Sequence, residues 1–149
     1  MASLLFPTDI RRQGIGLAIV RIVTGIVFMM HGQQKLFEYG ISGVTQSFTQ
    51  MGVPLPGISA PLVSLLEFFG GLALVIGLLT RLAAVGLAIN MVGAILIVHL
   101  AAGFFLPAGY EFALTLLGAS VALAIAGPGV FSVDEAIARR QAMRITAGR

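Results

Sequence analysis

Five ionisable side chains stand among apolar residues in this sequence, and their types suit proton transfer and the binding of a polar ligand. A histidine gains or loses a proton near neutral pH, and a carboxylate beside it can orient the ring or relay its proton. Gathered in one place, such groups could serve a polar ligand, a quinone headgroup or a proton path. In a purely structural interpretation, each of them instead reaches the membrane surface or hydrogen-bonds a neighbouring helix. The five are His31, Lys35, Glu67, His99 and Glu111.

A metal centre is a further use for part of this set, because two His and two Glu could hold a divalent ion in a helical bundle. The candidate ligands would be His31, Glu67, His99 and Glu111. However, the sequence has no Glu-x-x-His pair of the diiron type. The nearby Lys35 ammonium would also repel a cation. We therefore predict no metal site.

Arg21 is a second unusual charge, since it lies within the apolar stretch AIVRIVTG. An ionised group at membrane depth costs at least about 2.5–3.5 kcal/mol, so it needs a partner inside the protein. Glu67 is the only carboxylate near the middle of an apolar segment. Counting along the two helices puts Arg21 and Glu67 roughly 10 Å apart in depth. We predict a buried Arg21–Glu67 ion pair, with Glu111 as the alternative partner of Arg21.

The composition indicates a membrane protein that holds these residues in a bundle of helices. Of the 149 residues, 58% are hydrophobic and 10% are charged, and the mean hydropathy is +1.01. A membrane helix needs about 20 apolar residues, so we predict an all-α, integral-membrane four-helix bundle in a single domain, 1–149. The absence of cysteine excludes thiol chemistry and iron–sulfur clusters. The predicted spans are about 14–36, 60–79, 82–106 and 110–127.

The distribution of arginines predicts the orientation of these spans. Arginines concentrate before the first span, between the second and third, and in a basic tail over 130–149. By the positive-inside rule both termini lie in the cytoplasm of a bacterial inner membrane, and the arginines face lipid headgroups rather than nucleic acid. The first span is too long for a cleavable signal peptide, so we expect it to remain. These arginines are Arg11, Arg12, Arg81, Arg139, Arg140, Arg144 and Arg149.

The connecting segments and small residues carry further predictions. Ile41, Val44, Phe48 and Met51 recur at helical spacing, which predicts a short interfacial helix in the first outer loop. Ser132 and Glu135 have capping-box spacing and predict the start of a helix over 133–145. We interpret Asn90 as a helix-packing residue. Glycines also let helices approach closely in lipid, and the predicted packing positions are Gly25, Gly32, Gly70 and Gly71.

Several of these residues together resemble the DoxX family of small four-helix bacterial membrane proteins, over about 14–135. The resemblance implies a link to quinone-dependent oxidoreductase assemblies or to oxidative-stress systems, and a subunit rather than an autonomous enzyme. The residues that carry it are Arg21 and Gly25, the HGxxKL motif of His31, Gly32, Lys35 and Leu36, the pattern Glu67, Gly70 and Gly71 followed by GLLTR at 77–81, and the GPGxxSxD of Gly127, Pro128, Gly129, Ser132 and Asp134.

These observations favour a quinone- or redox-linked membrane subunit with a polar site in the outer half of the bundle. The sequence does not identify a cofactor, and a quinone is the candidate. Two other functions stay open. One is a non-enzymatic scaffold that holds soluble redox proteins at the cytoplasmic face through its basic ends. The other is a transporter of protons or small solutes, which would need a homo-oligomer to form a path.

Overall fold

The computed structural model describes residues 9–147 and is all-helical over that range. The predictions that concern residues 1–8 and Arg149 lie outside the described residues. A π-helical turn, Gln34–Glu38, continues α2, and α5 continues through a second one, Ala94–His99, into a 3-10 turn, Leu100–Ala102. The α-helices are α2 (Ile10–Gln33), α3 (Gly40–Gln50), α4 (Pro56–Ile76), α5 (Thr80–Gly93), α6 (Glu111–Ala126) and α7 (Val133–Ala147).

Three helical segments within the described chain are long and apolar enough to cross a membrane. They are Ile10–Glu38, Pro56–Ile76 and Thr80–Ala102, while Glu111–Ala126 is a shorter apolar helix. At 1.5 Å per residue, the 16 residues of α6 extend about 24 Å, somewhat less than a typical hydrocarbon core. The first segment begins before the predicted 14–36 span and runs two residues beyond it. The exact membrane boundaries stay a prediction.

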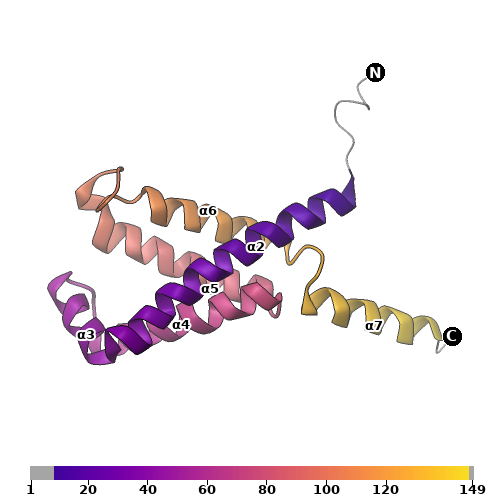
Figure 1. Cartoon of the computed structure of the whole chain (residues 1–149), viewed down its shortest axis with the longest axis horizontal. Helices are drawn as coiled ribbons and strands as arrows, with labels where there is room; N and C mark the ends of the chain where they lie inside the picture. The colour runs from indigo at the N-terminus through magenta and orange to yellow at the C-terminus, as the bar shows by residue number, and fades with distance from the viewer. Residues whose placement is uncertain (1–8, 148–149) are drawn as a thin grey trace, which may run out of the picture.

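The closest packing in the molecule is between α2 and α4, which lie side by side (Figure 1). A Cβ placed on Gly25 would lie 2.7 Å from the Gly71 carbonyl oxygen, and one on Gly71 would meet the Met29 backbone nitrogen. One on Gly32 would meet the backbone of Phe68. These three glycines therefore let the two backbones touch, whereas Gly70 faces the Leu87 side chain on α5 at an ordinary 3.4 Å.

The apolar core lies where α2, α4, α5 and α6 meet. Phe28, Leu74 and Leu87 are each no more than 1% exposed and come from three different helices. Ala113, Leu116 and Leu123 add the contribution of α6. Large apolar side chains on the opposite faces of these helices are exposed, as expected of surfaces that meet lipid.

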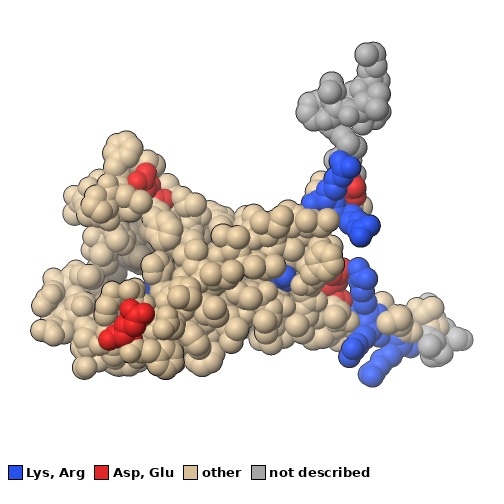
Figure 2. Space-filling model, in the orientation of Figure 1, with Lys and Arg blue, Asp and Glu red and all other residues tan. Residues whose placement is uncertain are grey.

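The start of α2 and the whole of α7 lie at one end of the molecule (Figure 1), which we call the basic end. Lys and Arg side chains gather there, while the long middle surface carries almost no charge (Figure 2). At the opposite, far end, α3 packs against α4 and buries Val44. The predicted helix in the first loop is therefore present, and its position at a membrane interface stays a prediction.

The segment that precedes and begins α7 closes the basic end. The Asp134 carboxylate accepts the backbone N–H groups of Leu79 and Thr80 at 2.8 and 2.9 Å, so it caps the start of α5. Ser132 Oγ accepts the Glu135 N–H at 3.1 Å, as the capping-box spacing predicted for α7. Burial works to raise the pKa of Asp134, but the hydrogen bonds from Thr80 and Leu79 outweigh it and the pKa is lowered.

We expect Gly71→Ala to destabilise the protein, because the added methyl group meets α2 backbone that cannot move aside. Overpacking of this kind costs about 1–3 kcal/mol, or a fall in Tm of about 3–10 °C. Circular dichroism of the protein in detergent measures it. Gly118→Ala is the matched control, since a Cβ there has nothing within 4 Å and should leave Tm unchanged or raise it. Equal losses in both variants would contradict the close contact.

We expect Asp134→Ala to lower the free energy of unfolding at pH 7 by about 1 kcal/mol, the usual loss for a helix cap. Because the pKa of Asp134 is lowered in the folded state, its contribution is present above the unfolded value of 3.8 and lost as the pH falls through the folded pKa. The difference between variant and wild type should therefore shrink below about pH 4. Asp9→Ala, which removes the exposed cap on Arg11 N–H, should have a smaller effect. A gap that is constant from pH 7 to pH 3 would contradict the assigned role.

Candidate functional site

A pocket of about 470 Å³ opens at the far end, between α2, α4, α5, α6 and α3. The surface is hollowed there, between α3 and the connection from α5 to α6 (Figure 2). Most of its wall is apolar, including Phe28, Phe48, Met91 and Leu116. Four of the five predicted site residues line it: His31, Lys35, Glu67 and His99.

The polar part of the wall is centred on Glu67, which is only 4% exposed. Lys35 Nζ donates to Glu67 Oε2 and forms an ion pair with it, and Asn90 Nδ2 donates to Glu67 Oε1 at 2.9 Å. Both carboxylate oxygens are thus satisfied by side chains from two other helices. A buried carboxylate needs such partners, and this one presents Lys35 and Asn90 to the cavity in fixed positions.

Both π-helical turns of the described chain border this pocket. Lys35 lies in the first, Gln34–Glu38, and His99 ends the second, Ala94–His99, whose Ile97 and Val98 also line the wall. A π turn widens a helix by one residue and leaves part of its backbone bonding irregular, and such turns are frequent at functional sites. Here they turn a polar side chain from each of two helices toward one cavity.

The two histidines that line the pocket, His31 and His99, differ in the groups that they contact. His99 Nδ1 lies 2.9 Å from the Ala108 carbonyl oxygen. A carbonyl can only accept, so Nδ1 carries the hydrogen, and in the neutral ring Nε2 is left as an acceptor. The His31 ring packs edge to face on Phe112, with centroids 6.0 Å apart. It makes no side-chain hydrogen bond to the described residues, so its nitrogens are available to a ligand.

Glu111, the fifth predicted residue, does not line the pocket. Its Oε1 accepts the Leu106 backbone N–H at 2.7 Å, so it holds the loop before α6. The helix begins at Glu111 itself, and this places the carboxylate at the loop rather than inside the bundle. Over residues 9–147, no three His, Asp or Glu side chains are close enough together to hold a metal ion.

The predicted Arg21–Glu67 ion pair is wrong. Glu67 pairs with Lys35, whereas Arg21 Nη2 donates to the Phe131 carbonyl oxygen at 2.9 Å. The Gly25–Gly71 contact sets the register so that the Arg21 guanidinium reaches Gly77. Gly77 lies ten residues along α4 from Glu67, about 15 Å in depth. Lys35, two heptads after Arg21 on the same face, reaches the carboxylate instead.

Asn90 lines the pocket and donates to Glu67, whereas the sequence interpretation assigns it to helix packing alone. A signal for it was present. Glu67 lies ten residues before Gly77 and Asn90 ten residues after Thr80, on either side of the tight α4–α5 connection. Two residues at equal distance from a tight connection between antiparallel helices lie at the same depth. The contact between Glu67 and Asn90 could therefore have been predicted from the sequence.

Comparison with known proteins identifies the family of this chain. The DoxX family model matches residues 16–100. Inner membrane protein YqjF of Escherichia coli (strain K12) is 36% identical over 143 residues, which cover 86% of this chain and 96% of YqjF. CatD of Bacillus subtilis (strain 168), provisionally named an oxidoreductase, is 35% identical over 120 residues, 80% of this chain and 85% of CatD. No solved structure matches the chain.

A third relative is a membrane protein of Mycobacterium tuberculosis, 34% identical over 132 residues, 81% of this chain and 80% of the relative. Three apolar segments of the described chain can each cross a bilayer, which makes this a multi-pass protein of the bacterial inner membrane. The family match spans more than half of the chain, and the relatives match over most of their length. The chain belongs to the DoxX family.

Proposed function

We propose that this protein is a quinone-linked subunit of a membrane oxidoreductase system, and that the far-end pocket binds the quinone headgroup. The observation that carries the proposal is the Lys35–Glu67–Asn90 cluster in the wall of an otherwise apolar cavity. Pockets for small organic ligands commonly have volumes of about 300–1,000 Å³ and a few placed polar groups. CatD, named provisionally as an oxidoreductase, adds support from a relative.

The residues of the pocket fit a quinone. Its two carbonyl oxygens need hydrogen-bond donors, and Lys35, Asn90 and His31 all have N–H groups left after the contacts described above. Ile97 and Phe112 are apolar residues that line the cavity and are 44% and 42% exposed. A lipid-soluble molecule could therefore enter from the bilayer without crossing water.

The same residues can hold and move protons. When bound, a quinone supplies two-electron redox chemistry that is coupled to two protons. The Glu67 carboxylate is placed to accept a proton from a hydroxyl group, while Lys35 and Asn90 keep it oriented. His99 Nε2 offers a second accepting nitrogen. The sequence has no cysteine to ligate an iron–sulfur cluster, so electrons would pass to a partner protein or to a further bound cofactor.

The proposal includes a topology of four spans, with α6 as the fourth and both ends of the chain in the cytoplasm. Arg11, Arg81 and Arg139 all lie at the end formed by the start of α2 and by α7, and the positive-inside rule assigns this end to the cytoplasm. The pocket would then lie in the outer half of a four-helix bundle.

Of the two other functions, the structure disfavours a transporter and favours a scaffold. Phe28, Leu74 and Leu87 form a packed apolar layer between the pocket and Arg21, which disfavours a path for ions through one chain. The exposed helix α7, with Arg139, Arg140 and Arg144, favours a role in holding soluble redox proteins as a second candidate. Deletion of 136–149 removes these arginines but keeps Asp134, which caps α5. It would separate the two roles, because quinone binding would persist while partners are lost.

We expect Glu67→Gln to weaken binding of a short-chain ubiquinone by at least about tenfold, the equivalent of about 1.4 kcal/mol. The substitution keeps the shape of the side chain but removes the charge that orients Lys35 and Asn90. Equilibrium dialysis of the purified protein against ubiquinone with one isoprene unit measures it. The matched control is Glu111→Gln, which removes a carboxylate outside the pocket and should bind as wild type does. Thermal unfolding of both variants separates a folding defect from lost affinity. Absent binding to wild type, or equal weakening in both variants, would overturn the proposal.

The topology makes a separate prediction, which the cysteine-free sequence allows to be tested with single introduced cysteines. In intact cells Ser42→Cys, on α3, should react with a membrane-impermeant maleimide. Gln141→Cys, on α7, should react only after the inner membrane is opened. Both positions are exposed, so access alone decides the result. The reverse pattern would show the opposite orientation. Labelling of both from outside would exclude the odd number of spans that the proposed topology places between them.

A further inference from the structure

A second hollow lies at the basic end, between the start of α2 and the beginning of α7, with a volume of about 800 Å³. Its wall combines cations with apolar side chains. Arg11 and Arg139 supply the cations, and Ile10, Val130 and Phe131 supply the apolar part. We call this hollow the basic groove. It is distinct from the far-end pocket and plays no part in the function proposed above.

The charges of the basic groove are positive in sum. Glu135, the one acidic residue in its wall, accepts the Arg139 Nη2–H at 2.6 Å and the Phe131 N–H at 3.1 Å, so both of its oxygens are engaged. The Arg139 side chain is nevertheless 73% exposed and keeps other N–H groups free. Arg11 forms no ion pair within residues 9–147.

A third positive charge lies directly behind the wall. Arg21 is fully buried, and its Nη2 donates to the carbonyl oxygen of Phe131, a residue that lines the groove. Its Nε and Nη1 have no hydrogen-bond partner in the described structure. A buried guanidinium is poorly screened by water and adds to the positive potential on the other side of the peptide.

We propose that the basic groove binds the headgroup of an acidic phospholipid. The phosphate would lie between Arg11 and Arg139, where two guanidinium groups can donate to its oxygens. The acyl chains would leave over Ile10 and Phe131, which are 84% and 76% exposed beside these cations. Such exposed apolar side chains would lie against lipid, and this favours a lipid over a soluble anion.

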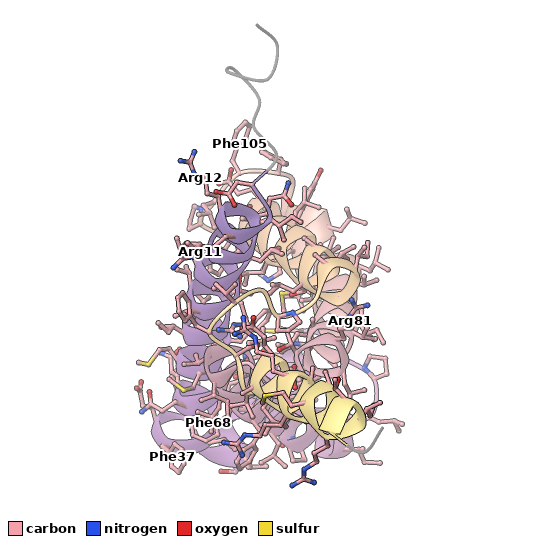
Figure 3. All side chains as sticks on the ribbon, turned by 90° about the vertical axis from the view of Figure 1, so that its right-hand side faces the viewer. Arg11, Arg12, Phe37, Phe68, Arg81 and Phe105 are labelled. Carbon is pink, nitrogen blue, oxygen red and sulfur yellow. The ribbon has the colours of Figure 1, made fainter. Side chains whose placement is uncertain are left out.

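The views of the basic end agree with this placement. Basic side chains at the start of α2 and on α7 face each other across this end of the molecule (Figure 2). Seen from the basic end, Arg11, Arg12 and Arg81 surround the helix ends and α7 lies in front (Figure 3). Since α2 enters its apolar stretch directly after these arginines, the groove lies at headgroup level of a membrane that α2 crosses.

Native mass spectrometry of the purified full-length protein tests the proposal, with dioleoyl phosphatidylglycerol and dioleoyl phosphatidylcholine added in equal amounts. We expect the phosphatidylglycerol adduct to dominate. Each arginine near an acidic membrane contributes roughly fivefold, so Arg11→Gln together with Arg139→Gln should lower the selectivity by about 25-fold. The matched control is Arg140→Gln with Arg144→Gln, which removes the same charge from α7 outside the groove and should keep most of the selectivity.

Three outcomes would overturn the proposal. Equal retention of the two lipids by wild type would exclude a selective site. Equal losses of phosphatidylglycerol selectivity in the groove variant and in the control would show that net charge, and not the groove, determines the selectivity. Displacement of the lipid by millimolar inorganic phosphate would show a site for soluble anions. Circular dichroism of each variant confirms folding, so a loss of adduct in a folded groove variant alone supports the assigned site.

Discussion

The backbone contact between α2 and α4 is the constraint on which the rest of the structure depends. Lipid provides no hydrophobic drive for helices to associate, so close packing of small residues has to hold them together. Gly25 and Gly71 let the two backbones touch, and this contact fixes the register of the helices. The register in turn decides which buried charges can meet. It brings Lys35 to Glu67 and takes Arg21 to the basic end.

Arg21 on α2 and Lys35 in the π turn that continues it show two solutions to the same electrostatic problem. Lys35 lies beside an apolar core and is neutralised by a carboxylate from α4. Arg21 instead extends along the helix until it reaches the polar backbone at Phe131, with Asp134 and Glu135 acting on it electrostatically. The long guanidinium side chain makes the second solution available, because it can reach past several residues to polar groups at the helix ends. One solution produces a structured pocket and the other closes the end of the bundle.

The sequence predicted the parts of this protein that depend on local patterns. The all-helical fold follows from long apolar segments, and α7 follows from the capping residues Ser132 and Glu135. Pairings between helices were harder to predict, because depth counted separately along two spans carries an error of several residues. That error is sufficient to exchange Arg21 for Lys35 as the partner of Glu67. The π turns gave no local signal, since AILIVH resembles an ordinary apolar helix and QKLFE the ordinary polar end of one. Glu111 does begin the last apolar helix, as its sequence position indicated, but its carboxylate binds the Leu106 N–H of the preceding loop, a contact that sequence spacing does not reveal.

The packed layer of Phe28, Leu74 and Leu87 also constrains how any ligand of the pocket could exchange protons. It separates the Glu67 cluster from the basic end, so in the proposed function protons that leave Glu67 would pass by way of the far-end pocket, which His31 and His99 line. In the proposed function a ligand would enter by a different route, past Ile97 and Phe112, which line the cavity and are partly exposed. A lipid-soluble redox molecule is suited to this arrangement, since it can arrive through the bilayer while its protons leave through water. A polar solute does not dissolve in the bilayer and could not enter from it. For this reason the apolar pocket favours a quinone over a transported solute.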